Sequence, residues 1–144
     1  NGPKKNAPIA PQEIPKISTI TSIFTSANNT ARTINPALEN RINKVCQYVQ
    51  KHAAEPLTIH KAAALIHLSP GAFCKFFKRI TGKTFSDYVN DIRIANVCSE
   101  LMATDKQVAE IAYSNGFETL TYFNRVFLRK KMMRPVGYRK LLKI

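Results

Sequence analysis

Apolar side chains recur every three or four positions from residue 36 onward, which is the spacing of one face of an α-helix. Short polar residues and prolines stand at several of the predicted helix starts, as at Asn35-Pro36 and Ser69-Pro70, where a cap and a residue without an N–H are favoured. No alternating strand pattern follows residue 35, so the predicted fold class is all-α. The pattern indicates about seven helices, near 36–52, 58–66, 70–81, 84–103, 107–114, 119–131 and 135–142.

Part of this pattern occurs twice. The stretches "SPGAFCKFFKRITG" and "ETLTYFNRVFLRKKM" each carry two phenylalanines four residues apart and then a run of cations. Each follows a short helix and a tight turn, and the short helix has an alanine where it would cross the next helix closely. The two copies are offset by 49 or 50 residues. A short helix, a turn and a second helix form a helix-turn-helix. We predict two such motifs, at about 58–82 and 107–131, joined by a long connecting helix at about 84–103.

Residues 1–34 differ in composition from the rest of the chain. Four prolines interrupt any early helix, and serine, threonine and asparagine dominate the stretch "STITSIFTSANNTARTIN". We interpret this segment as a linker from an upstream sensing or dimerisation domain, which agrees with a chain that does not begin with Met. Its isoleucines, spaced three apart, leave open a helix or strand that docks elsewhere.

The charge of the chain narrows its choice of partner. Twenty-two Lys and Arg against nine Asp and Glu give a net charge of +13, which favours a polyanionic partner. Nucleic acid comes first, with an anionic membrane surface or an acidic protein as alternatives. No apolar run is long enough for a membrane span, and three scattered cysteines without a C-x-x-C spacing are typical of reduced thiols in a cytoplasmic protein.

The second helix of each motif has an outer face that can meet DNA, opposite its inward-facing phenylalanines. We expect base contacts from Gly71, Cys74 and Lys75 in the first copy and from Leu120, Thr121, Asn124 and Arg125 in the second. We expect contacts to the DNA backbone from Lys78, Arg79, Arg129 and Lys130. Asn and Arg can pair bidentately with adenine and guanine, so the second copy is the better reader of sequence and the first supplies mainly backbone affinity.

A long motif in the second half resembles a known family. The stretch "ATDKQVAEIAYSNGFETLTYFNRVFLRK", with "RPVGYRK" after it, resembles the signature region of the AraC/XylS family of bacterial transcription regulators. The earlier "LSPGAFCKFFKRITGKTFSDYVNDIRI" is similar to that family's first helix-turn-helix and the start of its connecting helix.

The resemblance implies a DNA-binding domain at 35–144 whose two recognition helices enter successive major-groove segments of double-stranded DNA. It further implies sequence-specific control of bacterial transcription, usually as an activator. RNA polymerase is then an expected second partner, and dimerisation is expected through the missing N-terminal domain.

Several positions depart from the family pattern. Met132 stands where Gly usually ends the second recognition helix, so that helix either runs on or ends in a strained turn. Gln107, Glu118 and Arg134 stand where short capping residues are usual, and Glu100 replaces an apolar residue in the connecting helix.

Other residues leave alternatives open. Arg93 contacts the DNA backbone or pairs with a carboxylate such as Asp91 or Glu110, and Tyr88 and Tyr138 are expected to pack with their hydroxyls at the surface. The histidines and cysteines lack the spacing of a zinc site, and no catalytic constellation or phosphate-binding glycine loop occurs, so we expect neither a cofactor nor an enzyme.

Two further functions compete with DNA reading. The first is a helical protein-interaction module without specific DNA readout. The second is a fragment of a DNA-repair enzyme that uses Cys74, which could otherwise serve as an oxidant sensor or as a plain groove-facing thiol.

Overall fold

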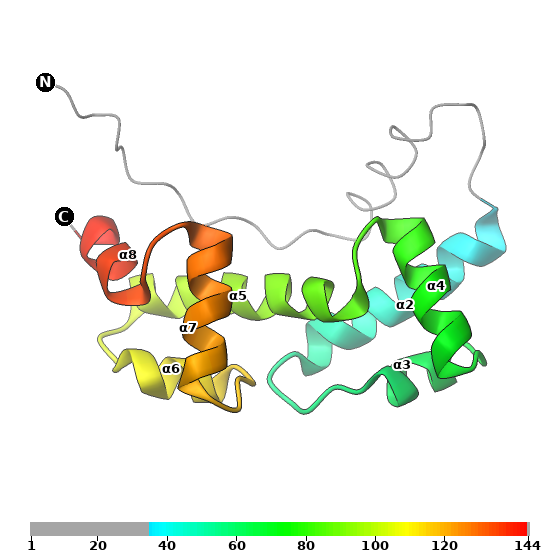
Figure 1. Cartoon of the computed structure of the whole chain (residues 1–144), viewed down its shortest axis with the longest axis horizontal. Coiled ribbons are helices and arrows are strands. Elements are labelled where there is room, and N and C mark those ends of the chain that lie inside the picture. Colours follow the sequence, from blue (N-terminus) through cyan, green and yellow to red (C-terminus); the bar gives the residue numbers. More distant parts are fainter. Residues whose placement is uncertain (1–34, 144) are drawn as a thin grey trace, which may run out of the picture. The chain divides into compact units, whose positions relative to one another are not determined.

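The computed structural model describes residues 35–143, and every regular element within them is a helix (Figure 1). The elements are α2 (Pro36–His52), α3 (Ile59–Leu65), α4 (Pro70–Thr81), α5 (Phe85–Ala103), α6 (Val108–Ser114), α7 (Leu120–Lys131) and α8 (Pro135–Leu142). The predicted all-α class, and seven helices over the described range, are therefore confirmed. The interpretation of residues 1–34 as a linker concerns a segment outside the described residues.

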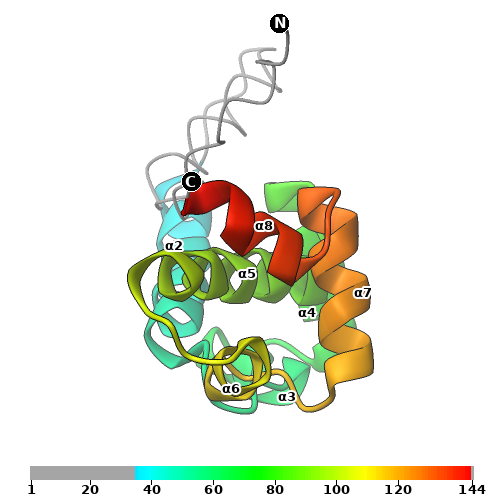
Figure 2. The same cartoon turned by 90° about the vertical axis from the view of Figure 1, so that its left-hand side faces the viewer.

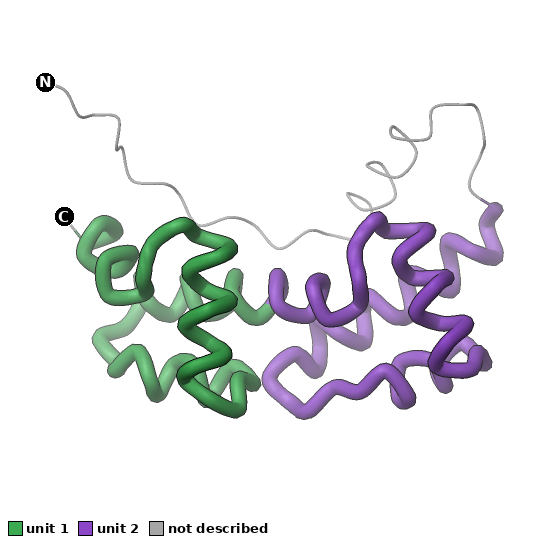
Figure 3. Tube along the Cα trace, in the orientation of Figure 1, with its two compact units in different colours: residues 1–13, 93–144 green, residues 14–92 purple. Residues whose placement is uncertain are grey.

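The described residues divide into two compact units within α5 (Figure 3). Unit 2 ends at Ile92 and contains α2, α3, α4 and the first part of α5. Unit 1 starts at Arg93 and contains the rest of α5 with α6, α7 and α8. Each unit holds one helix-turn-helix, formed by α3 and α4 in unit 2 and by α6 and α7 in unit 1.

The two cores repeat one aromatic arrangement. In unit 2 the rings of Phe73 and Phe77 lie 5.7 Å apart, and Phe77 lies 5.6 Å from Tyr88. In unit 1 the matching residues, 50 positions later, are separated by 5.7 Å and 5.5 Å. All four phenylalanines are fully buried, and each contributes about 1.5–3 kcal/mol of transfer free energy. The repeat seen in the sequence is thus a repeat of core packing.

The tyrosine hydroxyls do not reach the surface, so that expectation was wrong. Tyr88 and Tyr138 are 3% and 1% exposed, because each stands on the helix face that packs against a phenylalanine. The Tyr88 hydroxyl accepts a hydrogen bond from Gln50 Nε2 at 3.3 Å, and the Tyr138 hydroxyl lies near the Cys98 thiol without the geometry of a full hydrogen bond. Burial raises the pKa of both tyrosines.

The turn inside each motif contains an equivalent backbone hydrogen bond. The backbone N–H of Leu68 donates to Ala63 at 3.0 Å, and that of Phe117 donates to Ala112 at 3.2 Å. These bonds satisfy carbonyls at the ends of α3 and α6 and bring the next apolar side chain back onto the core. A hydroxyl then caps the second helix of each copy, and both capping bonds, from Ala72 N to Ser69 Oγ and from Tyr122 N to Thr119 Oγ1, measure 3.2 Å.

Two of the departures from the family pattern are resolved by the helix ends. Helix α7 ends at Lys131 and Met132 adopts a left-handed conformation with φ 61°, so the strained turn occurs and the extended helix does not. Glu118 is not a cap, because Thr119 occupies that position. A third departure, Glu100 in α5, has a polar partner: its carboxylate accepts a hydrogen bond from the buried side-chain amide of Asn115 at 2.9 Å.

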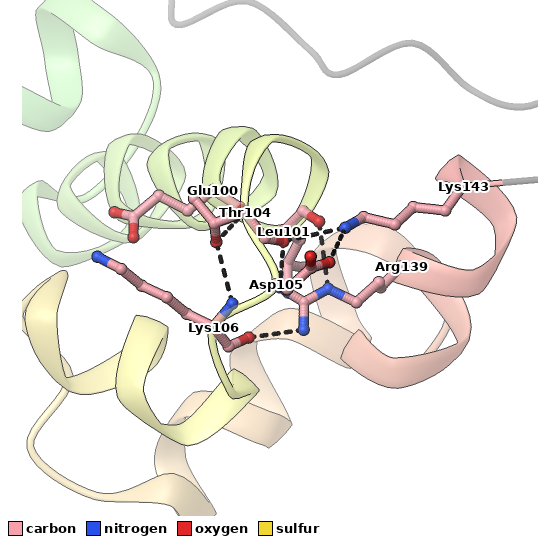
Figure 4. A network of polar contacts seen from close by, with 7 residues as sticks. All are labelled: Glu100, Leu101, Thr104, Asp105, Lys106, Arg139 and Lys143. Carbon is pink, nitrogen blue, oxygen red and sulfur yellow. Dashed lines mark hydrogen bonds and ion pairs between the residues drawn. The ribbon is translucent and has the colours of Figure 1, made fainter.

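Helix α8 fastens the connection between α5 and α6 (Figure 4). The Arg139 guanidinium donates hydrogen bonds to the carbonyl oxygens of Leu101 at 3.2 Å, Thr104 at 3.0 Å and Lys106 at 2.7 Å. Lys143 Nζ donates to Thr104 O at 3.0 Å and to Asp105 Oδ1 at 2.7 Å, and this contact lowers the pKa of the Asp105 carboxyl. The cations thus satisfy one carbonyl in the last turn of α5 and two carbonyls of the connection that follows it.

Candidate nucleic-acid interface

Helices α4 and α7 each have one buried and one exposed side. Their buried residues recur at helical spacing: Phe73, Phe76, Phe77 and Ile80 in α4, and Phe123, Val126 and Phe127 in α7. Figures 1 and 2 together show α7 at an outer side of unit 1. The face of α7 opposite its buried residues is therefore open to solvent. Such a helix can enter a major groove without rearrangement of its unit.

The outer face of α4 carries the residues predicted from the sequence. Gly71, Cys74 and Lys75 are all exposed, and so are Lys78 and Arg79 in the last turn. A Cβ added to Gly71 would meet no atom of the protein within 4 Å. The outer face of α4 is therefore open to solvent, carries small residues at positions 71 and 74, and is basic toward its C-terminal end.

The outer face of α7 carries most of its predicted residues. Thr121, Asn124 and Arg125 are exposed, and Arg129 is exposed beyond them. Leu120 is different, because it is partly buried and packs against the core of unit 1. Leu120, which was predicted to contact bases, therefore also contributes to the packing of the core.

Lys130 is also only partly exposed and makes interactions within the protein. It stands four residues after the buried Val126, so its stem runs along the edge of the buried face of α7. Arg129 is the more accessible of the two predicted phosphate contacts on this helix.

Equivalent positions of the two outer faces carry different chemistry. Positions 71, 74 and 75 of α4 correspond to 121, 124 and 125 of α7, each pair being 50 residues apart. The Arg125 guanidinium lies 5.6 Å from the centre of the Tyr122 ring, a cation–π contact that limits its orientations. We did not predict a role for Tyr122, although its three-residue spacing from Arg125 was a usable signal.

Arg93 lies partly inside unit 1. Its guanidinium is 6.0 Å from the centre of the Phe117 ring, and burial lowers its pKa while the charge of Glu118 opposes that shift. Asp91, one of the two carboxylates considered as its partner, forms an ion pair with Lys83. The aromatic contact with Phe117 was not predicted.

The charges of both helices suit a polyanion. Neither α4 nor α7 contains an acidic residue, and the last turns contain Lys78 and Arg79 in α4 and Arg129, Lys130 and Lys131 in α7. Cations there also interact favourably with the C-terminal end of the helix dipole. Within residues 35–143 no three His, Cys, Asp or Glu side chains lie together as metal ligands would, and no helix there has the length and apolarity to cross a membrane.

Comparisons with known proteins agree with this geometry. Residues 62–141 match the family described as "Helix-turn-helix domain". The regulatory protein PocR of Salmonella typhimurium is 32% identical over 114 residues, which cover 79% of this chain and 37% of PocR. The bifunctional transcriptional activator/DNA repair enzyme AdaA of Bacillus subtilis is 28% identical over 103 residues, which cover 72% of this chain and 49% of AdaA.

A solved structure with DNA shares the fold. The DNA-binding domain of AdpA, a global transcriptional factor determined in complex with a target DNA, superimposes with a TM-score of 0.65 over 69% of this chain and 90% of that domain, at 23% identity. At this identity the likeness establishes the fold. Solved AraC-family regulators share it as well.

The fold and the two exposed helices define a helix-turn-helix domain of the transcription-regulator class. More narrowly, the chain belongs to the AraC-type helix-turn-helix family. It spans 37% of PocR and 49% of AdaA.

Proposed function

We propose that this chain binds double-stranded DNA in a sequence-specific manner, with α7 reading base edges and α4 adding close contact and backbone affinity. The observation that carries the proposal is the pair of equivalent, exposed and acid-free helix faces in two units that share one core arrangement. A role in bacterial transcription is the corresponding inference from the family.

The reading surface of α7 has two bidentate side chains. Arg125 can donate to O6 and N7 of guanine, and Asn124 can pair with N6 and N7 of adenine. Thr121 can donate or accept at either base type, and its methyl group suits thymine. Because each bidentate pair discriminates by about 1–3 kcal/mol, two neighbouring pairs define a short preferred sequence.

The contribution of α4 is chemically simpler. Lys75 is its strong donor to bases, while Cys74 and Gly71 permit close apolar approach. Lys78 and Arg79, with Arg129 and Lys130 of α7, supply contacts to phosphates that do not depend on sequence. We propose that α4 and α7 enter successive major-groove segments of one duplex.

Features of the whole protein belong to the same proposal. We propose that the domain acts in the bacterial cytoplasm at the nucleoid, contacts RNA polymerase as an activator and dimerises through an N-terminal domain that precedes the linker at residues 1–34. One small domain has limited contact area, and dimerisation raises its effective concentration at a two-part site. The domain works without a cofactor and without a catalytic step.

The test is selection of bound duplexes from a random pool and then titration of Arg125→Ala. This change should remove the preference at one base position, costing about 1–3 kcal/mol on the preferred sequence and much less on others. Arg134→Ala is the matched control, because it removes an exposed arginine outside α4 and α7. Equal losses on every sequence for Arg125→Ala would show that this residue does not read bases.

A protein-interaction module is the second candidate. The observation that favours it is the exposure of apolar side chains around the end of α7, where Leu128, Met132 and Val136 are 43%, 81% and 55% exposed. Absence of DNA binding even at low salt would decide for this alternative.

The repair-enzyme alternative depends on Cys74, which is exposed, whereas Cys46 and Cys98 are buried. The similar protein AdaA is named as a DNA repair enzyme as well as an activator, which motivates a test of this alternative. Mass spectrometry after incubation with alkylated DNA tests it directly, since a transferred alkyl group adds its mass to the peptide that contains Cys74.

A further inference from the structure

Unit 2 contains a groove that runs beside the outer face of α4. Its volume is about 660 Å³, and it is bounded by α4, the first residue of α3 and the start of α5. The lining residues are Ile59, Cys74, Lys75, Lys78, Arg79, Thr84, Phe85 and Ser86. Two of them, Cys74 and Lys75, also belong to the face expected to meet bases, so the groove is continuous with that face.

The chemistry of the groove combines cations with apolar surface. Lys75, Lys78 and Arg79 line it, and no carboxylate does. Ile59 supplies apolar surface, whereas Phe85 lines the groove but is only 5% exposed, and Ser86 adds an exposed hydroxyl. The lining therefore suits an occupant that carries both negative charge and apolar surface.

The hydroxyl oxygen of Thr84 already accepts one hydrogen bond within the protein. Its Oγ1 accepts a hydrogen bond from the backbone N–H of Asp87 at 3.1 Å. Its hydrogen remains available as a donor, and Ser86, two residues later, offers a second donor on the same lip of the groove. Thr84 precedes α5 and Ser86 lies in its first turn, and neither residue was among those expected from the sequence to meet DNA.

We propose that this groove receives one sugar–phosphate strand of the duplex whose bases face α4, an inference that rests on the proposed function. Deoxyribose carbons lie against Ile59, and phosphate oxygens accept hydrogen bonds from Lys78, Arg79 and the hydroxyls of Thr84 and Ser86. The phosphates and sugars of one strand suit the cations and the apolar surface that line the groove. Backbone contacts of this kind fix the register and depth of a recognition helix.

The test uses two serines exposed on α5 that differ in position. Ser86 lines the groove, whereas Ser99 lies 13 residues later on the same helix and does not line it. Ser86→Glu and Ser99→Glu change the net charge equally. A carboxylate in the first turn of a helix is favourable to its stability, so the Ser86 variant folds, which circular dichroism during thermal unfolding checks.

Binding is measured by fluorescence anisotropy with a mixed-sequence duplex of about two helical turns, because a backbone contact does not need the operator. Ser86→Glu should weaken binding about tenfold more than Ser99→Glu, since its carboxylate would face adjacent phosphates. Ser86→Lys should tighten binding and steepen the salt dependence by about one further counterion, with a smaller effect for Ser99→Lys.

The outcomes separate the two proposals. Wild-type binding together with equal effects of the two glutamate substitutions would overturn the groove assignment and leave DNA binding standing. Failure of the wild-type protein to bind the duplex at low salt would overturn the proposed function itself, and the groove assignment with it.

Discussion

Units 1 and 2 have the same turns but distribute glycine in opposite ways. The turn between the motif helices has His67 at φ 58° in unit 2 and Gly116 at φ 98° in unit 1. The end of the second helix has Gly82 at φ 82° in unit 2 and Met132 at φ 61° in unit 1. Each unit thus has one left-handed glycine and one left-handed residue with a side chain.

The comparison shows that hydrogen bonds and core packing enforce these turns, even where glycine is absent. The N–H groups of Gly82 and Met132 donate to the carbonyls of Lys78 and Leu128 at the same 2.8 Å. Met132 is 81% exposed, so its side chain meets no obstacle and only the backbone conformation is costly. A left-handed residue other than glycine costs about 1–2 kcal/mol, which the rest of each unit offsets.

The largest expected effect tests whether the cores are equivalent. Phe77→Ala and Phe127→Ala each delete a fully buried ring at matched positions, and each should lower the free energy of unfolding by about 3–5 kcal/mol. Urea unfolding measures the loss, and hydrogen exchange should show lost protection concentrated in the unit that carries the substitution. A loss below about 1 kcal/mol for one of them would break the equivalence.

The buried thiols should make stability sensitive to alkaline pH in both units. Burial raises the pKa of Cys46 from 9.0 to about 11 and also raises that of Cys98. The folded state keeps the Cys46 proton that the unfolded chain loses near pH 9. This contribution is therefore complete below pH 9 and is lost as the pH rises toward 11, amounting to about 2–3 kcal/mol.

Urea unfolding at a series of pH values from 8 to 11 measures this loss. Cys46→Ala should flatten the decline over this range, and Cys98→Ala should do the same for the portion that belongs to unit 1. An unchanged slope in both variants would assign the alkaline loss to Tyr88 and Tyr138, whose pKa values burial also raises.

Exchange of residues at the helix ends sharpens the glycine comparison. Met132→Gly should raise the free energy of unfolding by about 0.5–1 kcal/mol, because it relieves the left-handed strain at some cost in unfolded-state entropy. Gly82→Ala should lower it by about 1–2 kcal/mol for the same reason in reverse. Thermal unfolding at one pH measures both, and effects of the same sign would contradict the explanation.

The smallest expected effect separates folding from recognition. Gly71 in α4 and Gly137 in α8 both have open space where a Cβ would lie. Gly71→Ala and Gly137→Ala should each raise the free energy of unfolding by up to about 1 kcal/mol. Only Gly71→Ala should weaken DNA binding, as measured by anisotropy, because in the proposed complex only that added methyl group would face the duplex. Equal binding by the two variants would remove Gly71 from the interface.

Much of the fold could be predicted because its signals are local. The caps Asn35, Thr58 and Ser69 accept hydrogen bonds from backbone N–H groups two or three residues later, so short sequence patterns reveal them. The inward faces of α4 and α7 can be read from the helical period alone. The outward positions of the two helices are then found by exclusion, which is why Cys74, Lys75, Asn124 and Arg125 were correctly placed on the exposed faces.

The missed features depend on contacts between distant positions. Arg139 reaches carbonyls 33 to 38 residues earlier in the chain, and nothing in its neighbourhood marks it as the clamp of the α5–α6 connection. The burial of the two tyrosine hydroxyls depends on how a later helix packs against the aromatic rings. The groove beside α4 needed α3, α4 and α5 together before Ser86 could be recognised as part of it.

The sequence by itself determined the helices, the duplicated motif and the outward chemistry of α4 and α7, because periodicity and capping act within one or two turns of the chain. Only the tertiary structure decided which positions bear left-handed strain, which polar groups are buried and where a basic groove opens. Those properties come from the packing of helices against one another, and local spacing does not encode them.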